Sequence, residues 1–144
     1  MNVAIIPARG GSKRIPRKNV KEFCGKPMIV WSIEAALKSD CFDKVVVSTD
    51  DPEIAEVALK FGAEVPFIRP GSLSDDFTGT TPVIKHAVEA LTADLNETSL
   101  VCCLYATAPF VTPEDLKRGL EKLVTSGSDF AFSVTSYAFP IQRA

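Results

Sequence analysis

The sequence is poor in the residues from which many catalytic and metal sites are built. Its 144 residues include a single histidine, His86, and four cysteines that lack the spacing of a metal or redox site. We expect His86 to face solvent, because the helix predicted around it turns Ile84 and Ala87 inward. Asp50 is expected to cap a helix rather than to act as a catalytic base, and no serine, histidine and aspartate triad emerges.

Long hydrophobic runs are also missing. No apolar segment approaches the roughly 18–20 residues that a membrane-spanning helix needs. The first apolar run begins almost at Met1 and is too short and wrongly flanked for a signal peptide, so we expect a cytoplasmic protein. A net charge of −2 argues against broad nucleic-acid binding. The length, with 46% hydrophobic residues, predicts one globular domain over residues 1–144.

The two commonest phosphate-binding motifs are absent as well, since there is neither Gly-x-x-x-x-Gly-Lys-Ser/Thr nor Gly-x-Gly-x-x-Gly. A basic loop that contains Gly10 and Gly11 nevertheless follows the first apolar run. Six of the 16 basic residues lie in a window without any of the 18 acidic ones, namely Arg9, Lys13, Arg14, Arg17, Lys18 and Lys21. Glycine N–H groups form anion-binding concavities and basic side chains neutralise phosphates, so the loop predicts a polyphosphate cradle. The alternative is a solvated basic surface loop.

Strands and helices alternate along the chain. Continuous apolar runs predict strands at residues 3–6, 45–48, 64–68, 100–104 and 130–135. Apolar residues at helical spacing predict helices that begin near residues 27, 51, 81 and 112. This pattern is typical of an α/β fold with a mostly parallel sheet and helices on both faces. Ligands bind at the carboxyl ends of such strands, so the basic loop, residues 69–80 and residues 105–110 are predicted to share one site.

The segment 3–19, Val-Ala-Ile-Ile-Pro-Ala-Arg-Gly-Gly-Ser-Lys-Arg-Ile-Pro-Arg-Lys-Asn, resembles a known signature. It is similar to the opening of the cytidylyltransferases that activate acidic sugars, the CMP-sialic acid synthetase superfamily. The resemblance runs over the whole chain. It implies a Rossmann-like fold of the nucleotidyltransferase type, which is glycosyltransferase-A-like. It also implies transfer of CMP from CTP to an acidic nine-carbon sugar, with release of pyrophosphate and with Mg²⁺ bridging the phosphates.

The resemblance assigns roles within the basic loop position by position. It implies that Arg9, Ser12 and Lys13 hold the triphosphate of CTP. Lys18 and Asn19 match the second family lysine and the asparagine that follows it. We expect Arg9, Lys13 and Lys18 to be catalytic, because attack on the α-phosphate needs charge neutralised on the transferred and leaving groups.

The remaining residues of the loop are expected to play smaller parts. Gly10 and Gly11 let the backbone approach the phosphates closely. Arg14 stands where many sialic acid members carry glycine, and it is expected either to help hold the phosphates or to be solvated. Arg17 and Lys21 are expected to be solvated.

Residues 69–80 are implied to contact the base. Arg69 matches a family arginine that contacts cytosine, and Thr78 and Thr80 match positions that contact the base from the same loop. Hydrogen-bonding groups around a pyrimidine edge discriminate cytosine from uracil, because a mismatched base leaves buried groups unpaired. The alternative for Arg69 is a surface salt bridge. Asp75 and Asp76 are expected to be loop or turn features, and no metal ligand is predicted.

The segment that follows the 100–104 strand departs from the usual sialic acid pattern. Gln-Pro-Thr-Ser-Pro is common there, and the glutamine, thought to meet the sugar, is replaced by Tyr105, while Thr107 keeps the family threonine. The Tyr-Ala-Thr-Ala-Pro-Phe version resembles the branch that acts on pseudaminic acid, which makes N-acetylneuraminate a doubtful substrate. The alternative for Tyr105 is a packed aromatic at the rim.

The sequence also fits other functions. The alternatives are an N-acylneuraminate cytidylyltransferase, a CMP-Kdo synthetase, a CTP-binding fragment without turnover, and a regulator that binds nucleotide sugars. The resembling enzymes continue beyond residue 144 with an Asp-x-Asp metal site, sugar contacts and an arm that exchanges with a partner subunit. The resemblance therefore implies that the C-terminal part is missing here and that the full-length protein is a homodimer.

Overall fold

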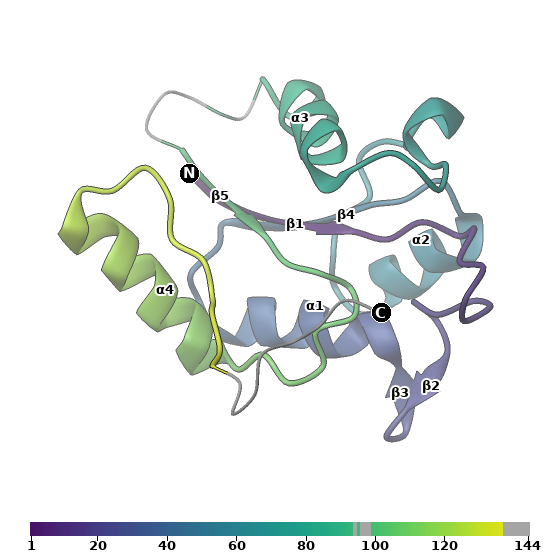
Figure 1. Ribbon diagram of the computed structural model, residues 1–144, viewed down its shortest axis with the longest axis horizontal. Helices are drawn as coiled ribbons and strands as arrows, with labels where there is room; N and C mark the ends of the chain where they lie inside the picture. Colours follow the sequence, from purple (N-terminus) through teal and green to yellow (C-terminus); the bar gives the residue numbers. More distant parts are fainter. Residues whose placement is uncertain (94, 96–98, 137–144) are drawn as a thin grey trace.

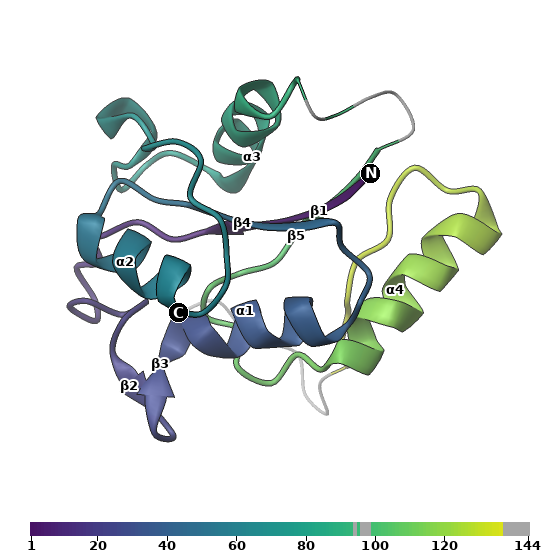
Figure 2. The ribbon, with the colours of Figure 1, turned by 180° about the vertical axis from the view of Figure 1, so that it is seen from behind.

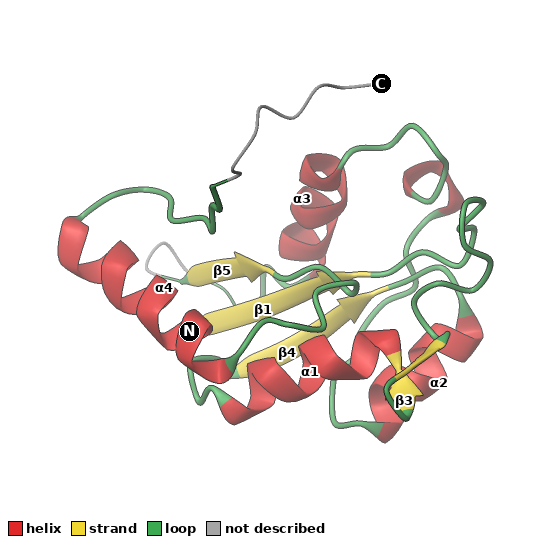
Figure 3. Ribbon diagram, turned by 60° about the horizontal axis from the view of Figure 1, so that its bottom comes forward, coloured by secondary structure: helices red, strands yellow, loops and turns green. Residues whose placement is uncertain are grey.

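The computed structural model describes residues 1–93, 95 and 99–136, and its centre is a three-stranded parallel sheet (Figure 1). The strands are β1 (Asn2–Pro7), β4 (Lys44–Ser48) and β5 (Leu100–Cys103). They lie in the order β4-β1-β5, so that β1 is paired on both of its edges (Figure 3). The parallel α/β sheet predicted from the sequence is therefore confirmed.

Helices cover both faces of this sheet (Figures 1 and 2). One face carries α1 (Met28–Lys38) and α2 (Pro52–Lys60), and the other carries α3 (Thr80–Ala90). The last helix, α4 (Pro113–Ser126), contacts α1. None of the helices in the described ranges is long and apolar enough to cross a membrane.

Successive side chains of β1 enter two different hydrophobic cores. Ala4 and Ile6 belong to the larger core beneath α1 and α2, whereas Val3 and Ile5 belong to the smaller core beneath α3. All four are fully buried. Because a strand covered on both faces needs apolar side chains at every position, β1 has a continuous apolar sequence rather than an alternating one.

A short hairpin carries the basic loop into α1. It consists of β2 (Glu22–Phe23) and β3 (Lys26–Pro27), which pair antiparallel, and Gly25 makes the turn between them with a φ of 87°. The N–H of Ile29 in the first turn of α1 donates to the Asn19 carbonyl at 2.9 Å. The end of the basic loop is thus fixed to the start of α1.

Two helices begin with side chains that satisfy their free N–H groups. Asp51 is the N-cap of α2, and its Oδ1 accepts a hydrogen bond from the Ile54 N–H at 3.1 Å. A capping box starts α4, where Thr112 Oγ1 accepts from the Asp115 N–H and Asp115 Oδ2 accepts from the Thr112 N–H, each at 3.1 Å. The helix starts predicted near residues 51 and 112 are therefore confirmed.

The strand predicted at residues 64–68 is reduced to one parallel bridge, between Val46 and Glu64. Pro66 follows closely, and its missing N–H cannot continue a ladder. The chain leaves the sheet and reaches the edge where the site lies. There the Arg69 N–H donates to the Thr49 carbonyl at 2.8 Å.

The strand predicted at residues 130–135 is wrong. Phe130, Phe132 and Val134 alternate with small and polar residues as in a strand, yet they are 84%, 84% and 82% exposed. Among the described residues no strand pairs with this segment, and a strand without a hydrogen-bonded neighbour has no ladder to stabilise it. Residues 137–144 of the predicted domain lie outside the described residues.

The solvent-facing position predicted for His86 is also wrong. The buried stripe of α3 runs through Val83 and Ala87 to Leu91 just after the helix. His86 lies beside this stripe and is half-buried, with its ring edge-on to Phe67 at 5.2 Å between centroids. The prediction turned Ile84 and Ala87 inward, but Ile84 is only partly buried and Val83 is buried in its place, so His86 lies nearer the stripe than expected.

Gly62 ends α2 in a conformation that suits only glycine. Its φ is 90°, and a Cβ there would lie 3.3 Å from Leu37 Cδ1. We expect Gly62→Ala to lower the free energy of unfolding by about 1–2 kcal/mol, the cost of holding a side chain in the left-handed region. Urea denaturation measures this change.

Gly119, in the interior of α4, is the matched control. No neighbouring atom lies within 4 Å of its Cβ position. Gly119→Ala should raise the free energy of unfolding by roughly 0.5–1 kcal/mol, because alanine is the better helix former. A similar loss of stability in both variants would contradict the conformational explanation.

Candidate active site

The three segments predicted to share a site meet at the carboxyl edge of the sheet. They line one hollow, which we call the inner hollow. Its lining residues are Pro7, Arg9, Ser12, Lys18, Asn19, Arg69, Leu73, Asp75, Thr78, Gly79, Thr80, Val83, Tyr105, Ala106 and Thr107. The structure therefore brings together the candidate phosphate, base and sugar residues from three distant parts of the sequence.

A second hollow adjoins the first, and we call it the cradle. It shares Arg9, Ser12 and Lys18 with the inner hollow. Its lining residues are Arg9, Ser12, Lys13, Arg14, Lys18 and Asp76. Four cationic side chains and one carboxylate surround this space, so the basic loop borders a concave, net positive hollow, which has the shape and charge that the predicted cradle requires.

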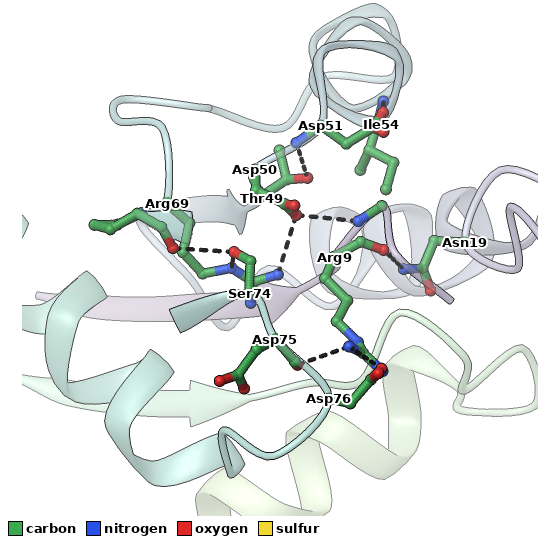
Figure 4. A network of polar contacts seen from close by, with 12 residues as sticks. Arg9, Asn19, Thr49, Asp50, Asp51, Ile54, Arg69, Ser74, Asp75 and Asp76 are labelled. Carbon is green, nitrogen blue, oxygen red and sulfur yellow. Dashed lines mark hydrogen bonds and ion pairs between the residues drawn. The ribbon is translucent and has the colours of Figure 1, made fainter. Parts of the chain in front are cut away.

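Arg9 joins the basic loop to the loop before α3 (Figure 4). Its Nη1 donates to the Asp75 carbonyl at 2.6 Å and to Asp76 Oδ1 at 2.8 Å. Its own carbonyl accepts a hydrogen bond from Nδ2 of the buried Asn19 at 3.0 Å. Asn19 thus fixes the backbone of Arg9, while the guanidinium reaches across to the second loop.

The two neighbouring aspartates of that loop do different work. Asp75 Oδ1 accepts from the N–H groups of Phe77 and Thr78 at 2.9 and 2.6 Å, which makes it the turn feature that was predicted. These bonds, together with the Thr78 side chain, lower the pKa of Asp75. Asp76 instead pairs with Lys13 Nζ and with Arg9, and these two cations lower its pKa. Only Asp75 therefore serves the local turn.

Gly10 lies against the start of α2 rather than free in the loop. Its N–H donates to Asp50 Oδ1 at 3.0 Å, and a Cβ at this position would lie 2.4 Å from Asp51 Oδ2. The absence of a side chain is thus required by this close approach. The prediction that Asp50 caps a helix is wrong, because Asp51 caps α2 and Asp50 holds the basic loop.

Arg69 is almost completely buried, with 4% of its surface exposed. Its Nε donates to Ser74 Oγ at 3.1 Å, and its Nη2 lies 3.5 Å from Asp50 Oδ1 (Figure 4). That contact is an ion pair without hydrogen-bond geometry, so Nη2 has no hydrogen-bond partner among the described residues. Burial lowers the pKa of Arg69 and the Asp50 charge opposes this, but a guanidinium still stays protonated.

The burial of Arg69 argues against one of its two predicted roles, the surface salt bridge. An arginine in a surface salt bridge would be solvated, whereas this one is buried beside the inner hollow, and its Nη2 is ion-paired with Asp50 without a hydrogen bond. A buried donor without a partner costs free energy, and an acceptor on a ligand would remove that cost. The geometry therefore favours a ligand contact over a surface salt bridge.

Arg17 was predicted to be solvated, and 41% of its side chain is exposed, but it is also ion-paired. Its Nη2 donates to Asp51 Oδ1 at 2.9 Å, and it also pairs with Glu53. Asp51 and Glu53 raise the pKa of Arg17, and Arg17 lowers the pKa of Asp51. Arg17 has a positive φ of 54°, so the loop turns sharply where this side chain attaches it to α2.

Tyr105 lies over the start of α3. Its hydroxyl is 3.0 Å from Thr80 Oγ1, and its carbonyl accepts from Ser32 Oγ at 2.8 Å. The residue is 55% exposed, so the ring stands at the rim of the inner hollow rather than within a core. Thr107, from the same segment, is exposed and lines the same hollow.

Reasoning from the sequence missed three contributors to the site. Asp50, Arg17 and Asp76 all act through partners about 34 to 67 positions away in the sequence. A local pattern does not reveal such pairs; the only available signal was the excess of basic residues in the loop, which called for acidic partners elsewhere. Within the described residues no group of three or more His, Cys, Asp or Glu side chains is placed to hold a metal ion.

Comparison of the sequence with known proteins finds cytidylyltransferases. A model of the cytidylyltransferase family matches residues 3–142. The chain is 54% identical over 143 residues to the pseudaminic acid cytidylyltransferase of Campylobacter jejuni, and the match covers 99% of this chain and 62% of that relative. It is 40% identical over 131 residues to N-acylneuraminate cytidylyltransferase A of Danio rerio, a match that covers 91% of this chain and 29% of that relative.

Comparison of structures agrees. A solved structure of a CMP:2-keto-3-deoxy-manno-octonic acid synthetase complexed with CTP superposes with a TM-score of 0.71 at 29% identity. The match covers 88% of this chain and 48% of that one. The chain thus spans less than two thirds of the length of the relatives it matches. By its family match, its sequence identity and its fold, the chain belongs to the cytidylyltransferase family.

Proposed function

We propose that this chain binds CTP, and that the protein carrying it transfers CMP from CTP to pseudaminic acid and releases pyrophosphate. The observation that carries the proposal is the meeting of a cationic cradle and a hollow lined by a buried arginine at one edge of the sheet. The choice of sugar is supported by 54% identity to a pseudaminic acid cytidylyltransferase, against 40% to an N-acylneuraminate cytidylyltransferase.

In this proposal the cradle takes the triphosphate. Lys13 and Arg14 are largely exposed around it, and Lys18 and Arg9 border both hollows. Ser12 adds a hydroxyl donor at the junction. Several cations around one concavity neutralise the charge of a triphosphate better than any single ion pair, because each phosphate oxygen accepts charge-assisted hydrogen bonds.

The inner hollow takes the cytosine. Arg69 offers its unused Nη2, and Thr78 and Thr80 line the same space. Thr78 Oγ1 lies 3.3 Å from the Ser72 carbonyl and also bonds to Asp75, so its one proton is engaged within the loop while its oxygen can accept. Donors and acceptors that line the hollow distinguish cytosine from uracil, because uracil leaves them unpaired.

In the proposed reaction the anomeric hydroxyl of the sugar attacks the α-phosphorus of CTP in line with the leaving pyrophosphate. A bond forms from the sugar oxygen to the α-phosphorus. The bond from that phosphorus to the bridging oxygen breaks, and pyrophosphate leaves with the electron pair. Arg9, Lys13 and Lys18 act by stabilising the charge that gathers on the phosphate oxygens. The proton of the attacking hydroxyl passes to water.

The rim of the inner hollow is where the sugar would meet this chain. Tyr105 presents a half-exposed ring there, with its hydroxyl engaged by Thr80, and Thr107 presents a hydroxyl beside it. An aromatic ring at this position offers an apolar face and one polar tip. We infer that this rim favours pseudaminic acid over N-acetylneuraminate.

Three further expectations stay proposals. Mg²⁺ would accompany the bound triphosphate and would help to neutralise its charge. The full-length protein is proposed to be a homodimer. It is proposed to act in the cytoplasm.

The first test concerns the base. CTP should bind this chain at least about tenfold more tightly than UTP or ATP, because only cytosine pairs with the groups around Arg69 and Thr78. Isothermal titration calorimetry with the three nucleotides measures the dissociation constants. Equal affinity for all three would contradict the assignment of the inner hollow to the base.

The second test concerns the cradle. Arg9→Ala should weaken CTP binding by roughly 1.5–3 kcal/mol, the usual worth of a hydrogen bond to a charged group. Lys117→Ala is the control, because this exposed lysine of α4 lies outside both hollows. Calorimetry again gives the dissociation constants, and urea denaturation verifies that both variants fold. An equal loss of affinity in the two variants would sink the cradle assignment.

The third test concerns the sugar and uses the full-length protein. Tyr105→Gln should shift the ratio of kcat/KM for pseudaminic acid over N-acetylneuraminate by about tenfold or more toward N-acetylneuraminate, within the range of one changed pocket contact. Tyr105→Phe keeps the ring, loses the bond to Thr80 and should retain the original preference. Pyrophosphate release measures both rates. An unchanged ratio in Tyr105→Gln would refute a role of this side chain in choosing the sugar.

A further inference from the structure

The cradle contains a carboxylate of the chain itself. Asp76 is the only acidic residue among its lining residues, and both of its oxygens are used. Oδ1 accepts from Arg9 Nη1 at 2.8 Å, and Oδ2 pairs with Lys13 Nζ. These are two of the cations to which the proposed function assigns the triphosphate.

A carboxylate in this position resembles a phosphate in its chemistry. It has negative charge and two acceptor oxygens, which are the features by which arginine and lysine recognise phosphate. Arg9 and Lys13 lie more than 60 positions from Asp76 in the sequence, so the contact is not a by-product of a local turn. The local turn is made by the neighbour Asp75, whose side chain accepts from Phe77 and Thr78.

We propose that Asp76 is an internal substitute for phosphate, which occupies Arg9 and Lys13 in the nucleotide-free protein and releases them when triphosphate or pyrophosphate binds. This inference rests on the proposed function, because it needs the cradle to be the phosphate site. It adds a competing anion that sets how tightly the cradle holds phosphates.

Because the three side chains are partly exposed, phosphate can replace Asp76 at Arg9 and Lys13 at a small free-energy cost. The side chains of Asp76, Arg9 and Lys13 are 29%, 34% and 80% exposed. Ion pairs between exposed groups are weak, because water screens the charges and long side chains lose freedom. Pyrophosphate carries more charge and more acceptor oxygens than one carboxylate, and it would repel a carboxylate left beside it. The incoming phosphate therefore displaces Asp76 at little cost.

The same exchange would connect the two hollows. Asp76 is followed within four residues by Thr78 and Thr80, which line the inner hollow. Arg9 also donates to the Asp75 carbonyl, so the guanidinium holds the loop at two points. When Arg9 leaves Asp76, only its contact with the Asp75 carbonyl remains. The loop of residues 69–80, which carries the base contacts, can then change its position. Loss of pyrophosphate after the reaction would let Asp76 return.

The test is calorimetric titration of the chain with inorganic pyrophosphate. Asp76→Asn should bind pyrophosphate about threefold to tenfold more tightly than the unaltered chain, the gain expected when two exposed ion pairs no longer compete. Glu53→Gln is the matched control, because it removes one negative charge that pairs with Arg17 outside both hollows. Its affinity should change by less than about twofold.

The outcomes separate this inference from the proposed function. Pyrophosphate binding that is unchanged or weaker in Asp76→Asn would overturn the inference, because a residue that merely positions Arg9 and Lys13 would help binding. An equal gain in Glu53→Gln would overturn it too, since the effect would then be one of net charge. If neither variant nor the unaltered chain binds pyrophosphate or CTP, the proposed function fails and the inference falls with it.

Discussion

The pairing of β1 on both edges and its burial on both faces is the constraint on which the rest of the molecule depends. β4 and β5 flank it in parallel, so the three strands end at the same edge. Side chains of β1 alternate between two cores, and helices on both faces complete them. A strand held in this way cannot shift without breaking two ladders and two cores, and it therefore offers a fixed base for the loop that leaves its end.

A second set of interactions turns that loop into a site. The lysine and arginine side chains of the basic loop would repel one another if they were unpaired. Acidic partners come from two other segments of the chain. Asp50 and Asp51, at the end of β4 and the start of α2, hold Gly10 and Arg17. Asp76 faces the loop from the opposite side and meets Arg9. The loop is thus held at its start and near its end, while the cations between these points border the cradle.

Much of this was predictable from the sequence, and the failures have physical causes. The 3–6 and 45–48 runs predicted strands correctly because apolar burial on both faces leaves a continuous pattern. Pro66 interrupts the 64–68 run, and the 130–135 run alternates with small and polar residues and pairs with no strand among the described residues. The site residues Arg9, Lys18 and Arg69 were found through the family resemblance and the excess of basic residues, whereas the acidic partners depend on contacts that only the fold creates.

The helix α4 has a further consequence. None of its residues is fully buried, and its described contacts are chiefly with α1, whereas β1 is enclosed on every side. Backbone amides in such a helix exchange with solvent deuterium through local opening, at a free-energy cost well below that of unfolding the sheet. We therefore expect the backbone amides of β1 to be more strongly protected from hydrogen exchange than those of α4. The basic loop leaves directly from the end of β1, so it is attached to the part of the chain that we expect to open last.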